Sequence, residues 1–160
     1  MPDNTDTQRD IRGVLIQVTG GRLLLPNASV AEVITYSEPE PVSNAPEWLL
    51  GRVRWRGWRL PLLSFSRLAG WSSEDGQMGA KVAVLKALGG NAKLPFFAVL
   101  SQGFPRLVTV SRDTLVTDTS VDVALPEGVQ ARVLLNENEA LLPDLEHVEV
   151  LISQALRQAA

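Results

Sequence analysis

The sequence contains no cysteine and only one histidine, His147. Without thiolates it has neither a disulfide framework nor the sulfur ligands of zinc, and one imidazole cannot build a histidine-rich metal site. It also has no run of about 18 apolar residues, so no membrane span is expected, and the polar start over residues 1–10 lacks the apolar core of a signal peptide. These absences predict a cytoplasmic protein with no disulfide, no metal and no direct insertion into a membrane.

Signatures of catalysis and nucleotide binding are missing as well. There is no Gly-x-Ser-x-Gly, Walker-A or Gly-x-Gly-x-x-Gly motif, and the glycine pair at 89–90 predicts a turn rather than a phosphate loop. Paired carboxylates at 74–75 and at 137 and 139 suit acid–base work, but they fall in a predicted loop and turn, where solvated roles are expected. His147 is expected on a helix surface. The sequence therefore predicts neither an enzyme nor a cofactor.

Lysine is scarce. The chain has 15 basic residues and a net charge of −3, and the basic residues include three lysines and twelve arginines, four of them within 52–59. The negative total argues against bulk polyanion binding. Because arginine makes planar, bidentate contacts with carboxylates, the local cluster predicts an acidic protein partner. A solvated strand face is the alternative interpretation.

Short apolar runs with turn residues between them predict a mostly β protein. Strands are expected at 11–19, 22–26, on both sides of Gly57, at 81–88, 94–102, 106–111 and 113–118, and as a hairpin over 129–143. Asn27 is expected to cap a short helix over 28–34, and Asp144 a C-terminal amphipathic helix ending near Arg157. Residues 1–10 are predicted to be a disordered tail, and 36–46 and 70–80 loops. No clear sequence repeat relates the two halves, and the pattern alone leaves barrels and a single sandwich open.

The segment 46–70, PEWLLGRVRWRGWRLPLLSFSRLAG, is the most informative part of the chain. Its alternation predicts a strand with Arg52, Arg54 and Arg56 on one face and an apolar pair, Val53 and Trp55, on the other. Gly57 supplies the conformation that a tight reversal needs. The segment therefore predicts a rigid surface that presents charge to a partner.

The tryptophans of this segment have different expected roles. Trp55 is expected to pack inward and Trp48 to hold its turn against a barrel. Trp58 is expected to be exposed beside Arg56 and Arg59, which is typical of an interface anchor. Aromatic and arginine side chains on a β surface also fit single-stranded nucleic acid. An unrelated β-barrel that binds a ligand or nucleic acid is therefore the second hypothesis, and an enzyme of unrecognised chemistry the third.

The same segment resembles the central block of CheW-like domains, the coupling proteins of bacterial chemosensory arrays. Its pattern is Pro-x-x-x-x-Gly-x-(apolar)-x-x-Arg-Gly-x-x-x-Pro-(apolar)-(apolar), here Pro46, Gly51, Arg56, Gly57, Pro61, Leu62 and Leu63. Residues 140–148, ALLPDLEHV, resemble the family's closing strand, and 29–34, SVAEVI, its first short helix. The resemblance covers roughly residues 11–156. The chain departs from it at Ser64, where the family has Asp, and over 97–101.

The resemblance implies a fold of two small five-stranded, SH3-like β-barrels packed on a shared apolar seam, with short helices and a C-terminal helix. The domain would span 11–160, with barrels at about 22–80 and 81–140 and terminal segments crossing between them. It implies a non-enzymatic adaptor between the cytoplasmic tip of a chemoreceptor and the regulatory domain of a CheA-type histidine kinase, recruited to the inner-membrane array. Receptor contact would involve Val30 and Arg56, with Gly57, Trp58 and Arg59 beside them. The departures suggest a specialised relative, for example in pilus-based motility.

Overall fold

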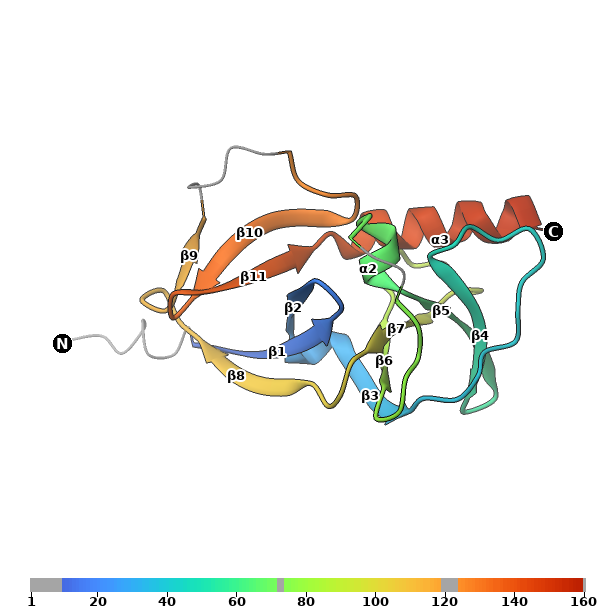
Figure 1. The fold of residues 1–160 in the computed structure, drawn as a ribbon, viewed down its shortest axis with the longest axis horizontal. Helices are drawn as coiled ribbons and strands as arrows, with labels where there is room; N and C mark the ends of the chain where they lie inside the picture. The colour runs from blue at the N-terminus through green and yellow to red at the C-terminus, as the bar shows by residue number, and fades with distance from the viewer. Residues whose placement is uncertain (1–9, 72–73, 119–123, 160) are drawn as a thin grey trace.

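The computed structural model describes residues 10–71, 74–118 and 124–159, so nearly all of the predicted tail lies outside the described residues. The elements, shown in Figure 1, are β1 (Ile11–Val18), β2 (Gly21–Pro26), the 3-10 helix η1 (Asn27–Ser29), β3 (Val30–Thr35), β4 (Leu49–Trp55), β5 (Trp58–Leu63), α2 (Phe65–Leu68), β6 (Lys81–Lys86), β7 (Phe96–Ser101), β8 (Arg106–Val110), β9 (Leu115–Thr117), β10 (Val129–Leu135), β11 (Asn138–Pro143) and α3 (Leu145–Ala159).

The strands form two curled sheets that lie side by side along the long axis of the molecule (Figure 1). Barrel A has six strands in the order β8-β1-β2-β11-β10-β9, and barrel B has five in the order β3-β6-β7-β5-β4. The mostly β, two-barrel fold is confirmed. The expected five strands hold for barrel B, whereas β9 adds a sixth strand to barrel A.

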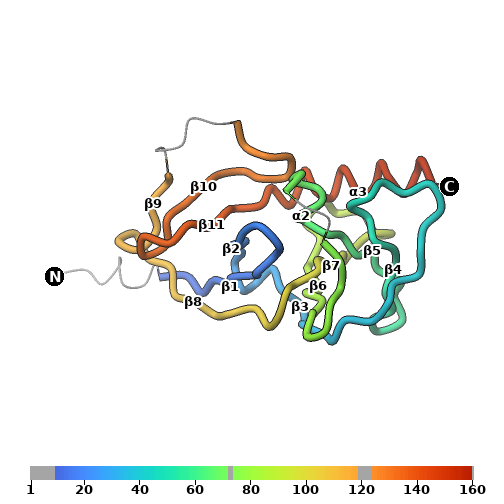
Figure 2. The backbone as a smooth tube through the Cα atoms, viewed as in Figure 1, coloured from blue at the N-terminus to red at the C-terminus, as the bar shows by residue number. Residues whose placement is uncertain are grey.

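The barrels do not follow the expected division at 22–80 and 81–140. Barrel B takes its strands from 30–101, and barrel A takes the two ends of the chain, 11–26 and 106–143. The chain leaves barrel A after β2 and returns after β7 (Figure 2). Each barrel contains one parallel junction, β2 with β11 and β5 with β7, which joins hairpins distant in the sequence. The boundaries were therefore wrong because sequence order does not reveal this exchange of strands.

Three apolar clusters fill the molecule, one inside each barrel and one between the barrels. The middle cluster, called the seam below, takes Val14, Ile16 and Val18 from β1, and Phe97 and Val99 from β7. Alternate residues of the same strands fill the barrels, for example Ala98 and Leu100 in barrel B. Strands buried on both faces read as continuous apolar runs, which is why the sequence shows FFAVL and LLL. Helix α3 covers the seam from one side (Figure 1), with Val148 and Ile152 in it.

The predicted helix over 28–34 is wrong. A single 3-10 turn covers Asn27–Ser29, with no side-chain cap, and the following residues form β3. Val33 and Ile34 pair with Ala83 and Val82 of β6. β-Branched residues favour strands, and the open edge of β6 supplies the partner that makes the strand form.

The C-terminal helix was predicted correctly. His147 N donates to Asp144 Oδ1 at 3.1 Å, so Asp144 caps the helix as expected. Val148, Ile152 and Ala155 are buried, whereas Val150 faces solvent. The helix therefore buries the apolar stripe that its periodicity indicated.

The structure reveals an internal repeat that the sequence analysis missed. Residues 46–68 and 126–148 align without a gap at a shift of 80 positions, and five pairs are identical: Pro46/Pro126, Glu47/Glu127, Arg52/Arg132, Val53/Val133 and Leu62/Leu142. Both segments form hairpins of seven-residue and six-residue strands, with a bulge near the start and a helix after the end.

Hydrogen bonds of the two hairpins match at the same shift. Ser64 N donates to Trp48 O, and Asp144 N to Gly128 O, both at 2.8 Å. Ser64 and Asp144 each accept a bond from the backbone amide three residues later. The first repeat, β1 to α2, thus places its first hairpin in barrel A and its second in barrel B, and the second repeat, β6 to α3, does the reverse.

Candidate protein interface at the β4–β5 hairpin

The β4–β5 hairpin closes in a two-residue turn at Arg56 and Gly57. Their φ angles are 47° and 82°, as in a type I′ turn, which matches the twist of paired strands. Trp55 and Trp58 face each other as the last pair before the turn. Arg56 was expected on the strand face with Arg52, so its position in the turn corrects that assignment. A left-handed conformation is uncommon for arginine and fixes the direction in which its side chain leaves the hairpin.

Glu32 of β3 anchors this turn. Its Oε1 lies 2.9 Å from Arg56 Nη2 and accepts a hydrogen bond from Trp55 Nε1 at 3.0 Å. The guanidinium also lies over the Trp55 ring, 5.0 Å from its centroid. Because β3 and β4 are the two outer strands of the five-stranded sheet, this carboxylate joins the sheet edges and helps to close barrel B.

A second carboxylate, Glu40, partly neutralises Arg54 and Arg59. Arg54 and Arg59 lie directly opposite each other on β4 and β5, where like charges repel. Glu40 lies 3.7 Å from Arg54 Nε and 2.9 Å from Arg59 Nη2. Its backbone pairs in both directions with Arg52 at 2.8 Å. The arginines of this cluster are therefore partly paired with glutamates on the same surface. Less of their positive charge is available to a phosphate backbone than the sequence indicated.

The tip of the hairpin also exposes an aromatic ring. Trp58 is 40% exposed, whereas Trp55 is 8% exposed and packs edge-on against Phe96. A shallow cleft of about 450 Å³ is lined by residues 54–59. The exposure of Trp58 and the burial of Trp55 confirm those expectations. An exposed tryptophan framed by arginines has the composition of an interface centre.

Val30 lies on β3, the strand whose Glu32 contacts Arg56. It begins β3, pairs with Leu85 and is partly buried against the seam. Glu32, two residues later, makes the contacts to the turn. Val30 and Glu32 thus share one strand, with a bulge between them, and it is Glu32 that contacts Arg56.

The sequence analysis missed a buried carboxylate, Glu74. It was expected to be solvated, but it is 1% exposed. Its Oε2 accepts from Thr19 N at 2.8 Å and Gln102 Nε2 at 3.1 Å, and its Oε1 accepts from Ser64 Oγ at 2.7 Å. Ser64, where the resembled pattern has Asp, thus caps α2 and serves as a donor to this carboxylate. The sequence of a polar loop does not reveal hydrogen-bond donors that lie far away in the chain, as Thr19 does.

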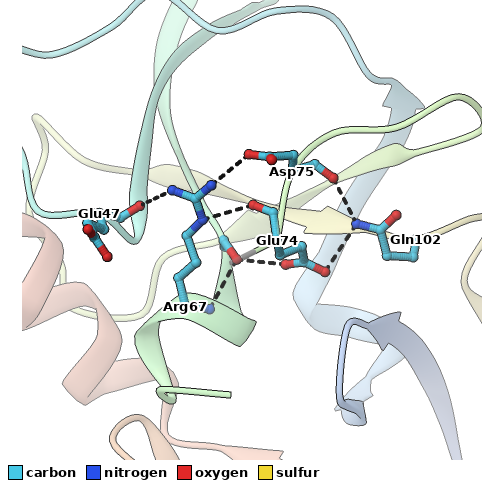
Figure 3. Close-up of polar contacts among 6 residues, drawn as sticks. Glu47, Arg67, Glu74, Asp75 and Gln102 are labelled. Atoms are coloured by element: carbon cyan, nitrogen blue, oxygen red, sulfur yellow. Dashed lines mark hydrogen bonds and ion pairs between the residues drawn. The ribbon is translucent and has the colours of Figure 1, made fainter. Parts of the chain in front are cut away.

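Arg67 of α2 holds the same loop in place. It donates to Glu74 O at 2.9 Å, Glu47 O at 3.1 Å and Asp75 Oδ1 at 2.6 Å (Figure 3). Glu74 and Asp75 are therefore held by contacts from both α2 and barrel A. A cleft of about 460 Å³ beside it is lined by Tyr36, the proline-rich 38–47 loop and Gly76.

The single histidine makes a surface contact with a carboxylate. His147 Nε2 lies 2.9 Å from Glu127 Oε1 on the surface. Among residues 10–71, 74–118 and 124–159, no group of three or more His, Asp or Glu side chains is placed to hold a metal ion. No described helix is both long enough and apolar enough to cross a membrane.

Comparison with known proteins decides the family. The model of the CheW-like domain matches residues 12–150. The chain belongs to the CheW-like domain family. Among solved structures, it is similar to the scaffolding protein TtCheW from Thermoanaerobacter tengcongensis, with a TM-score of 0.69, 12% sequence identity and 84% of each chain covered. At that identity the likeness establishes the fold of the CheW-like domain. A search of curated proteins finds no significant match.

Proposed function

We propose that this CheW-like domain is a non-enzymatic adaptor in bacterial chemosensory signalling. Membership of the family supports a scaffold role. The specific partners that we infer are the cytoplasmic tip of a chemoreceptor and the regulatory domain of a CheA-type histidine kinase. A pilus-motility pathway is the variant suggested by the departures at Ser64 and 97–101. The protein would act in the cytoplasm and be recruited to the receptor array at the inner membrane.

The observation that carries the proposal is the tip of the β4–β5 hairpin. Trp58 is partly exposed, and Arg56 and Arg59 flank it on a type I′ turn that Glu32 anchors. Interfaces with concentrated binding energy commonly use tryptophan and arginine on a rigid support. We assign receptor contact to Val30, Arg56, Gly57, Trp58 and Arg59. No kinase contact is assigned to particular residues.

The experiment is co-purification with the receptor and kinase set of the host. Wild-type protein should retain a receptor cytoplasmic fragment and the kinase together, and Trp58→Ala should lose the receptor fragment while its melting temperature stays close to that of wild type. Gln130→Ala, an exposed change on β10, is the matched control. Failure of the wild type to retain either partner, or salt-dependent binding of single-stranded oligonucleotides at similar affinity, would contradict the proposal.

A further inference from the structure

Two carboxylates are buried within the part of the chain that the structure describes. Glu74 is 1% exposed and Glu149 is 6% exposed. Each is bound by hydrogen-bond donors from an element distant in the sequence. Because a buried carboxylate is unfavourable unless donors satisfy it, these positions depend on the surrounding geometry.

Glu149 connects α3 to barrel B. The helix follows β11 of barrel A, and the Glu149 carboxylate accepts from Leu88 N at 2.7 Å and Gly89 N at 2.8 Å, just after β6 of barrel B. A Cβ atom at Gly89 would lie 2.9 Å from Glu149 Oε1. Each oxygen thus takes one backbone amide, and the glycine allows the close approach.

Glu74 makes the reverse connection. It follows β5 and α2 of barrel B, and its Oε2 accepts from Thr19 N in the β1–β2 turn of barrel A. Ser64 Oγ and Gln102 Nε2 complete the set of donors. Three donors therefore converge on one carboxylate where the barrels meet.

The two connections are similar in kind, although the two carboxylates are not aligned by the repeat. In each repeat, the carboxylate follows the second hairpin, Glu74 after helix α2 and Glu149 within helix α3. It binds the turn of the first hairpin of the same repeat, which lies in the other barrel. The pair therefore spans the junction between the barrels twice, in opposite directions.

The hydrogen bonds of Glu74 and Glu149 can fix the angle between the barrels, which the apolar seam cannot do. Hydrophobic burial is non-directional and scales with area, so the seam holds the barrels together without specifying one angle. Hydrogen bonds to a charged group require particular distances and directions. We propose that Glu74 and Glu149 form two clasps that set the angle between the barrels, and so fix the relative orientation of surfaces on barrel A and barrel B.

The test measures the inter-barrel angle directly. The chain has no cysteine, so Thr35→Cys on β3 and Thr117→Cys on β9, both exposed, give a clean spin-label pair across the barrels. Glu149→Gln replaces one acceptor with an NH₂ group facing a backbone amide, and Glu74→Gln removes the charge that strengthens the bonds from Thr19 N and Gln102 Nε2. Each variant should shift or broaden the distance distribution, and the double variant more so. Glu146→Gln, exposed on α3, should match wild type.

Hydrogen exchange identifies each clasp separately. Glu74→Gln should speed exchange of the Thr19 amide about tenfold or more, and Glu149→Gln that of the Leu88 and Gly89 amides. If these amides lose protection while the distances stay as in wild type, the seam sets the angle and the proposal fails. If a Gln variant does not fold, Glu74→Asp and Glu149→Asp, which keep the charge but shorten the reach, should broaden the distribution, and an unchanged distribution would again overturn it. None of these readouts requires a receptor or kinase, so they stand apart from the proposed function.

Discussion

At the scale of single residues, Arg56 offers a way to separate stability from recognition. Its backbone sits at φ 47° and its side chain is 70% exposed beside Glu32. The corresponding turn of the other hairpin has Asn136 at φ 50°, and asparagine before glycine is the preferred type I′ pair. Backbone and side-chain roles at this position can therefore be changed independently.

We expect Arg56→Asn to leave the free energy of unfolding within about 1 kcal/mol of wild type, because a better turn residue offsets the loss of an exposed ion pair. Receptor binding should weaken by about 1–3 kcal/mol. Arg56→Ala should also change stability by less than about 1 kcal/mol, and Arg56→Lys should not restore binding because lysine lacks the guanidinium fork. Calorimetry and chemical denaturation check both quantities.

Arg52→Ala, on the strand that leads into the turn, is the control and should weaken binding less. If Arg56→Asn unfolds the protein, Arg56 is needed for the fold, and its role is structural. Unchanged binding in Arg56→Asn and Arg56→Ala would remove Arg56 from the interface.

Tyr36 gives a pH-dependent prediction. Desolvation, with the nearby charges of Glu38 and Asp75, raises the pKa of Tyr36 above its ordinary 10.0. The Tyr36 hydroxyl therefore ionises at lower pH in the unfolded chain than in the folded protein. The contribution of neutral Tyr36 to the free energy of unfolding is present below pH 10 and is lost as the pH rises through the folded pKa. Tyr36 is the only tyrosine, so tyrosinate absorbance reports it alone. A native midpoint at or below that of the denatured protein would contradict this.

At the scale of elements, most strands and the hairpin over 129–143 could be predicted from sequence, but β3 and the pairings between hairpins could not. Runs such as 96–100 are apolar at every position because both faces are buried, which marks a strand without showing what it pairs with. The segment 28–34 has helical spacing but β-branched residues, and pairing with β6 decides its conformation. The exposure of Trp58 could be predicted because it stands beside Gly57 and close to two arginines in the sequence. Glu74 was not, since its donor Thr19 is 55 residues away.

The cap of α2 allows a test of this element-level reasoning. Ser64 Oγ is 2.7 Å from Glu74 Oε1 and also accepts from Arg67 N. Ser64→Asp restores the residue of the family pattern but places two carboxylates together, so we expect a loss of about 1–3 kcal/mol in stability. In a Glu74→Gln background the same change should cost clearly less. Equal costs in both backgrounds, measured by denaturation in a double-mutant cycle, would show that the two side chains are not coupled.

The bulges of the two hairpins differ in what they tolerate. Gly51 has φ 144°, and a Cβ there would collide with the backbone of Glu40, whereas Ala131 fills the corresponding position of β10. We expect Gly51→Ala to destabilise the fold by about 1–3 kcal/mol and to disturb the Glu40–Arg52 pairing. Gly79→Ala, also at positive φ but with nothing near its Cβ, is the control and should cost less. Thermal denaturation of both variants checks this, and equal costs would contradict it.

At the scale of the whole molecule, neither repeat can complete a barrel alone. Barrel B needs β6 and β7 from the second repeat, and barrel A needs β1 and β2 from the first. We expect fragments 1–78 and 79–160, divided in an exposed turn next to Met78, to lack cooperative unfolding when separate and to regain the strand circular dichroism of the intact chain when mixed. Cooperative unfolding of either fragment alone would contradict the exchanged arrangement.

The parallel contact between β2 and β11 has a consequence for biosynthesis. β2 ends at Pro26 and β11 at Pro143, so the first hairpin leaves the ribosome long before the strand that covers its edge. At about 5–20 residues per second this interval is roughly 6–23 s. During it, a hairpin that is apolar on both faces has an open edge, the kind of strand that pairs with other chains. Newly made copies of this chain therefore expose a strand edge for longer than a two-domain protein of equal size, whose first domain closes early.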